Sequence, residues 1–128
     1  MNLVSTVVTS PILLVEDDAL SRDLYRLALE RSGHSVVIVE DGFAALKHIE
    51  SALPPVIVLD MLLPRLSGRD LLRQLRANPE TRHIPVVIIT GSDVSNMSER
   101  AGIPVLQKPF AMSLLVDAVD AALRRASA

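Results

Sequence analysis

Short continuous runs of apolar residues recur along the 128-residue chain, and they limit its fold more than any other feature. Adjacent apolar positions, rather than alternating ones, are typical of strands that are buried on both faces of a parallel sheet. The predicted strands cover residues 11–15, 35–39, 56–59, 85–90 and 105–107. Because helical segments separate these strands, and because crossovers between parallel strands are right-handed, we expect a doubly wound α/β fold with helices on both faces of the sheet.

Helix signals fill the segments between the strands. The predicted helices cover residues 19–31, 43–51, from 68 towards 78, a short segment around 95–101, and 112–125. In the first of them, Leu20, Leu24 and Leu27 recur at helical spacing. Asp18 has the position and chemistry of its N-cap, and Gly33 is its expected stop. The regular alternation of strands and helices indicates one domain over residues 11–126.

Two of the predicted strands end in acidic residues. Glu16 and Asp17 follow the first strand, and Asp60 closes the third. The carboxyl ends of parallel strands lie together at the edge of the sheet where ligands bind, so we expect one acidic pocket there. At an effective dielectric constant near 20, two carboxylates ~4 Å apart repel each other by roughly 4 kcal/mol. The pocket therefore predicts a bound divalent cation, whereas the neighbouring Asp18 is better explained as a helix cap.

Composition excludes several classes of function. The chain has 13 Lys and Arg against 15 Asp and Glu, and its net charge of −2 offers no general electrostatic footprint for nucleic acid. Cysteine is absent, which excludes disulfides and thiolate metal sites. No apolar run approaches the ~20 residues of a membrane helix, and residues 1–10 lack the basic start of a signal peptide. We expect an N-terminal lead-in over residues 1–10 and a cytoplasmic domain without membrane or direct nucleic-acid partners.

Four motifs near the carboxyl ends of the strands carry a resemblance to a known family. They are ILLVEDD at 12–18, VLDMLLP at 58–64 followed by Gly68, VVIITG at 86–91 and KPF at 108–110. In this order and spacing they resemble the receiver domain of bacterial two-component response regulators over nearly the whole chain. Both the single-domain chemotaxis type and the hybrid-kinase type are similar. The resemblance implies a flavodoxin-like sheet of five parallel strands in the order 2-1-3-4-5.

The resemblance also implies a phosphorylation-controlled signalling switch rather than an enzyme with a separate substrate. Asp60 would accept a phosphoryl group from a sensor histidine kinase or a phosphotransfer protein, in a reaction that the domain catalyses on itself. A carboxylate can act as the nucleophile of such a transfer and form an aspartyl phosphate. Thr90 and Lys108 would contact the phosphoryl oxygens, and Lys108 would contact the Asp60 carboxylate beforehand. Phosphorylation would then change the affinity for a downstream effector that the sequence does not identify.

The cofactor implied by the same resemblance is Mg²⁺. Asp17, Asp60 and the main-chain carbonyl of Leu62 would bind the ion directly, and Glu16 would act mainly through water. Magnesium suits a site that is built from carboxylates, water and phosphate oxygens. The Leu62 side chain has no role in this binding.

Two features depart from the usual pattern of the family. Val105 stands three positions before Lys108, where an aromatic side chain usually reports phosphorylation to the outer face. The segment from Thr90 to Lys108 is also shorter than is usual, which predicts a short or distorted fourth helix. This helix, the fifth strand and the last helix form the common dimer surface of the family, so a homodimer is allowed but not required. A receiver that docks its partner constitutively is therefore a second hypothesis.

Two enzyme-like or nucleotide-binding functions fit the residues less well. A magnesium-dependent phosphatase that uses Asp60 as its nucleophile would need a second aspartate two positions later, and Leu62 occupies that position. A nucleotide-binding Rossmann domain would need a glycine-rich loop after the first strand, where this chain has Glu16, Asp17 and Asp18.

Overall fold

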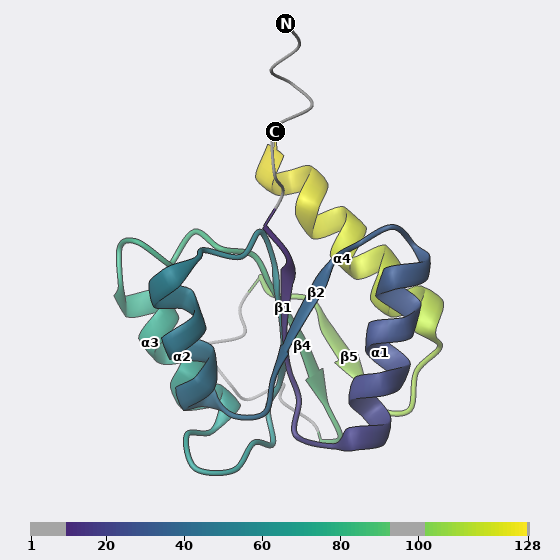
Figure 1. Ribbon diagram of the computed structural model, residues 1–128, viewed down its shortest axis with the longest axis horizontal. Coiled ribbons are helices and arrows are strands. Elements are labelled where there is room, and N and C mark those ends of the chain that lie inside the picture. Colours follow the sequence, from purple (N-terminus) through teal and green to yellow (C-terminus); the bar gives the residue numbers. More distant parts are fainter. Residues whose placement is uncertain (1–9, 93–101, 128) are drawn as a thin grey trace, which may run out of the picture.

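In the computed structural model, residues 10–92 and 102–127 are described, and they form five strands and four helices (Figure 1). The strands are β1 (Ile12–Val15), β2 (Val36–Val39), β3 (Ile57–Asp60), β4 (Val86–Thr90) and β5 (Val105–Gln107). The helices are α1 (Ala19–Arg31), α2 (Gly42–Ser51), α3 (Gly68–Ala77) and α4 (Met112–Ser127). The helix predicted around residues 95–101 lies outside the described residues, as does most of the predicted lead-in, so the division into lead-in and domain stays a prediction.

All the strand pairs are parallel, and the strands follow the order β2-β1-β3-β4-β5. Helices α2 and α3 cover one face of this sheet, and α1 and α4 cover the other (Figure 1). This arrangement confirms the predicted doubly wound, flavodoxin-like fold. Among the described helices, none combines the length and the apolar character that a bilayer span needs.

Each face of the sheet carries its own apolar core. Within β1, Leu13 and Val15 belong to the core under α2 and α3, whereas Ile12 and Leu14 belong to the core under α1 and α4. Successive side chains of a strand point to opposite faces, so a strand that is covered on both faces must be apolar at every position. Full burial of one such aliphatic side chain stabilises the fold by roughly 1.5–3 kcal/mol. This requirement explains the continuous apolar runs of the sequence.

Helix α1 begins and ends as predicted, but its three leucines at the predicted helical spacing face outward. The Asp18 side chain accepts a hydrogen bond from the Ser21 N–H at 2.9 Å, which confirms it as the N-cap. Tyr25 and Leu29 are the buried residues of this helix, while Leu20, Leu24 and Leu27 are exposed. The Tyr25 ring stacks on Phe110, with 5.7 Å between the ring centroids, and this contact belongs to the core between α1 and α4.

Candidate functional site

The carboxyl ends of the strands bring the predicted site residues to one edge of the sheet, the lower edge in Figure 1. Glu16 and Asp17 follow β1, Asp60 is the last residue of β3, Thr90 is the last residue of β4, and Lys108 follows β5. In the register of the sheet, Asp60 pairs with Ile89. Residues that are far apart in the sequence thus meet because parallel strands all end on the same side.

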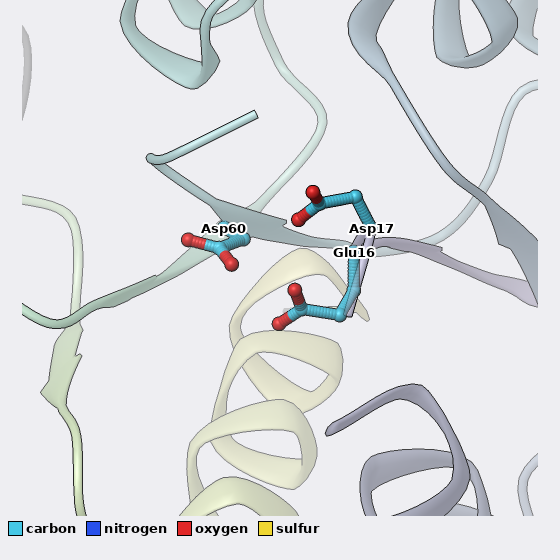
Figure 2. A group of neighbouring side chains, drawn as sticks. All are labelled: Glu16, Asp17 and Asp60. Carbon is cyan, nitrogen blue, oxygen red and sulfur yellow. The ribbon is translucent and has the colours of Figure 1, made fainter. Parts of the chain in front are cut away.

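Three carboxylates form a compact acidic cluster at this edge. Glu16, Asp17 and Asp60 each offer one oxygen, and these oxygens lie within 4.8 Å of one another. Figure 2 shows the Glu16 and Asp17 side chains extending from the end of β1 towards Asp60. Glu16 and Asp60 are buried, whereas Asp17 is exposed and leaves the cluster open to solvent. An all-oxygen donor set of this kind fits a hard divalent cation, so the cluster could bind a metal.

One ammonium group faces the buried part of the cluster. The Lys108 Nζ lies 3.3 Å from Asp60 Oδ2 and 3.4 Å from Glu16 Oε1. The sequence predicts the contact with Asp60 but gives no sign of the contact with Glu16. Among the described residues, Lys108 is the positive charge in contact with this group of three carboxylates, so they keep an excess of negative charge that a cation can neutralise.

The electrostatics of the cluster favour a proton on Glu16 when no cation is present. Burial raises the pKa of Glu16 from 4.5 to about 7, and the nearby Asp60 carboxylate contributes to this rise, against the opposing effects of the Asp18 N–H and Lys108. Partial burial lowers the pKa of Lys108, but the Asp60 and Glu16 carboxylates outweigh this effect and hold it above its ordinary value. Lys108 is therefore charged at neutral pH, while Glu16 is poised between its two states.

The loop after β3 presents a main-chain N–H to the cluster. The Leu62 N–H donates to Asp60 Oδ1 at 3.0 Å, while the Leu62 side chain is 83% exposed. Gly68 begins α3 directly against this loop, and a Cβ there would lie 2.5 Å from the Asp60 carbonyl oxygen. A larger residue could not occupy that position without moving the main chain that carries Asp60.

Thr90 joins the site from β4. It is buried, and its hydroxyl oxygen accepts a hydrogen bond from the Ser92 N–H at 3.1 Å. The Lys108 N–H donates to the Thr90 carbonyl at 2.8 Å, so the two residues are neighbours across the sheet. The Lys108–Pro109 peptide bond is cis. The structure therefore brings Glu16, Asp17, Asp60 and Lys108 together directly. Leu62 joins them through its N–H on Asp60, and Thr90 joins them through its carbonyl on the Lys108 N–H. The binding of a metal by the Leu62 carbonyl stays a prediction.

The sequence profile of the response regulator receiver domain matches residues 12–120 of the chain. The chain belongs to this receiver family. Phosphorylation-based signalling is the role of the family.

Relatives of the receiver include longer response regulators and isolated receiver domains. It is 38% identical to the response regulator MprA of Mycobacterium sp. (strain KMS) over 122 residues, which cover 91% of this chain and 51% of that protein. The chain therefore spans about half the length of the curated relatives it matches. A response regulator structure from Chloroflexus aurantiacus aligns with a TM-score of 0.83 at 31% identity, covering 92% of this chain and all of that one. The receiver domain of a histidine kinase from Syntrophus aciditrophicus gives 0.83 at 28% identity, covering 91% and 92% respectively.

Proposed function

We propose that the receiver accepts a phosphoryl group on Asp60 in a Mg²⁺-dependent reaction that it catalyses on itself, and that phosphorylation switches its affinity for a partner. The observation that carries this proposal is the cluster of three carboxylates within 4.8 Å, with the Lys108 ammonium 3.3 Å from Asp60. A carboxylate nucleophile, a cation site and a fixed positive charge are the parts that phosphoryl transfer needs, because its catalysis is mostly positioning and charge neutralisation.

Each residue would have a separate task in this reaction. An Asp60 oxygen attacks phosphorus, the new O–P bond forms as the P–N bond of a phosphohistidine breaks, and the electron pair of that bond stays on the imidazole. Lys108 and the Thr90 hydroxyl would stabilise the charge on the phosphoryl oxygens. Mg²⁺, held by Asp17, Asp60 and the Leu62 carbonyl, with Glu16 acting through water, would neutralise the carboxylates and the incoming phosphoryl group.

The surroundings of the site support a protein as the phosphoryl donor, namely a sensor histidine kinase or a phosphotransfer protein. Large apolar side chains lie exposed where α1 and α2 begin and where β3 ends: Leu20 is 69% exposed, Phe43 57% and Leu62 83%. A hollow beside Lys108 is lined in part by Leu24 and Pro109. Exposed apolar residues of this kind suit a protein surface better than a small soluble donor. The downstream effector, a homodimer and the cytoplasmic location stay predictions.

Intact-mass measurement after incubation with Mg²⁺ and acetyl phosphate or phosphoramidate tests the proposal. We expect one added phosphoryl group on the wild-type chain and none on Asp60→Asn, which keeps the shape of the side chain but loses the nucleophile. Removal of Mg²⁺ with a chelator should abolish the addition, and Lys108→Ala should reduce it. An unchanged mass of the wild-type chain, with donor and Mg²⁺ in excess, would contradict the proposal.

A further inference from the structure

The loop between β3 and α3, residues 61–67, carries the Leu62 N–H that donates to Asp60, and both of its ends are held by close contacts. At one end, a Cβ on Gly68 would lie 2.5 Å from the Asp60 carbonyl oxygen. At the other end, a Cβ on Gly42, the first residue of α2, would lie 2.8 Å from the Leu66 carbonyl oxygen. The loop is therefore packed against the first turns of two helices.

The centre of the loop is held by an ion pair. The Arg65 guanidinium binds the Asp41 carboxylate through Nη2 and Oδ2. Among the non-glycine residues that the structure describes, Arg65 alone has a positive φ, of 64°. This left-handed conformation is unfavourable for a residue with a side chain, so it persists where surrounding contacts impose it. The contact with Asp41 is such a constraint.

Asp41 is a rigid anchor for this ion pair. Its Oδ1 accepts the Ala44 N–H at 2.8 Å and caps α2, which leaves Oδ2 for Arg65. The Asp41 side chain is 9% exposed, whereas that of Arg65 is 67% exposed. The Ala44 N–H, and to a smaller extent Arg65, hold the pKa of Asp41 below its ordinary value, so the carboxylate is charged at neutral pH.

Leu62 depends on such anchors because its own side chain is 83% exposed and contributes no packing. Its main chain is fixed on one side by the hydrogen bond to Asp60, and on the other by the buried Leu63 and by Arg65. Pro64, between these two residues, restricts the intervening backbone. A shift at Arg65 would therefore be passed to Leu62 over a short, stiff segment.

We propose that Asp41 and Arg65 are positioning residues, whose ion pair holds the loop so that the Leu62 main chain faces the carboxylate cluster in a geometry that binds Mg²⁺. The inference rests on the proposed function, because it assigns these residues to the same metal site. Neither residue belongs to the cluster itself. The pair acts through the backbone of residues 62–65.

Four variants of the full chain separate positioning from general stability. Asp41→Asn keeps the oxygen that caps α2 but presents an amide, rather than a carboxylate, to Arg65; asparagine is as good an N-cap as aspartate. Arg65→Gly removes the guanidinium and also removes the cost of the left-handed conformation. Arg65→Lys keeps a positive charge as the conservative rescue. The double variant of Asp41→Asn and Arg65→Gly completes a double-mutant cycle.

Mg²⁺ affinity, measured by calorimetry without a phosphoryl donor, should weaken about two- to fivefold in Asp41→Asn and in Arg65→Gly, since an ion pair with one exposed partner contributes no more than that. The double variant should bind no more weakly than either single one, and Arg65→Lys should regain most of the affinity. Thermal unfolding should show Arg65→Gly to be no less stable than the wild type. Hydrogen exchange without metal should also change in Asp41→Asn, Arg65→Gly and the double variant. In each, the Leu62 and Gly68 amide hydrogens should exchange with solvent faster than in the wild type, while the core amides of β3 should exchange at the same rate.

Three results would overturn the inference. The first is that both single variants bind Mg²⁺ with wild-type affinity. The second is that the fold losses of Mg²⁺ affinity in the two single variants multiply in the double variant. The third is that Mg²⁺ affinity falls in every variant in step with a loss of stability. A failure of the proposed function would look different. If acetyl phosphate did not modify the wild-type chain, the proposed function would be contradicted, whether or not the ion pair controlled Mg²⁺ binding. A wild-type chain that binds no Mg²⁺ would overturn both.

Discussion

The half of the site formed by β1 and β3 differs in construction from the half formed by β4 and β5. In the first, Glu16 and Asp60 are buried, and the contact at Gly68 leaves no space for a side chain. In the second, β5 has three residues, of which Val105 and Leu106 are half-buried and Gln107 is exposed. The acidic half is thus held by the core and by a packed loop, whereas in the other half β4 is buried and β5 borders solvent.

If the proposed function holds, this contrast implies that metal binding and the reporting of phosphorylation can be separated in this receiver. The carboxylates and the loop after β3 form one packed unit, so changes there should alter Mg²⁺ binding. Val105 only packs partly against the core under α2 and α3. Changes at that position should therefore reach partners without altering the chemistry at Asp60.

Loss of the Asp17 charge should have the largest effect on Mg²⁺ binding. We expect Asp17→Asn to weaken Mg²⁺ binding at least about tenfold, because it removes one of the three carboxylates that attract the cation. Asp17 is exposed, so the core should not change. Without metal, the variant should be slightly more stable than the wild type, since less negative charge is crowded at the cluster. Calorimetry and thermal unfolding measure the two effects.

Thr90→Val is the matched change in the other half of the site. It removes the hydroxyl that contacts Ser92 but no charge, so Mg²⁺ affinity should stay within about twofold of the wild type. If Thr90→Val weakened Mg²⁺ binding as much as Asp17→Asn does, the two halves would not be separable.

The sheet and the acidic cluster could be predicted from the sequence because both follow from local patterns. A strand covered on both faces must be apolar throughout, which the run from Ile12 to Val15 displays directly. Polar residues at the carboxyl ends of parallel strands must then share one edge, so Asp17 and Asp60 could be brought together without any knowledge of contacts. Each inference needed only a few adjacent residues.

Other features could not be predicted because they depend on partners that are distant in the sequence. Leu20, Leu24 and Leu27 have helical spacing, yet the face of α1 that points inward is formed by Tyr25 and Leu29. Tyr25 stacks on Phe110, and this contact belongs to the core under α1 and α4. The contact of Lys108 with Glu16 depends on how deeply Glu16 is buried. The pairing of Arg65 with Asp41 depends on a loop conformation that has no signature in the sequence.

The burial of Glu16 predicts a pH dependence of stability. Without metal, its pKa lies near 4.5 in the unfolded chain and at about 7 in the folded one, chiefly because of burial. The folded state then binds more protons between these values, so the free energy of unfolding should fall as pH rises from 4.5 to 7, by at most about 3 kcal/mol. Urea titrations across this range should show the fall, and Glu16→Gln should remove most of it.

Saturating Mg²⁺ is the second control for this pH dependence. The cation favours the ionised carboxylates, so in its presence the fall in stability between pH 4.5 and 7 should become smaller. A fall of the same size in Glu16→Gln and in the wild type would assign the pH dependence to another group, and burial would then not be what raises the pKa of Glu16.

Truncation of Val105 should have the smallest effect on the chemistry of the site. Val105 is half-buried against the core under α2 and α3, so Val105→Ala should cost about 1 kcal/mol of stability. Mg²⁺ affinity and the yield of phosphorylated Asp60 should not change, because the side chain lies outside the packed acidic half.

Partner affinity tests the role of Val105 in the switch. If Val105→Ala still bound its partner more tightly with a stable phosphoryl mimic than without it, Val105 would not be needed for the switch. Equal affinities in the wild type, with and without the mimic, would favour constitutive docking. Slower phosphorylation of Val105→Ala would instead show that β5 acts on the chemistry at β3, across β4.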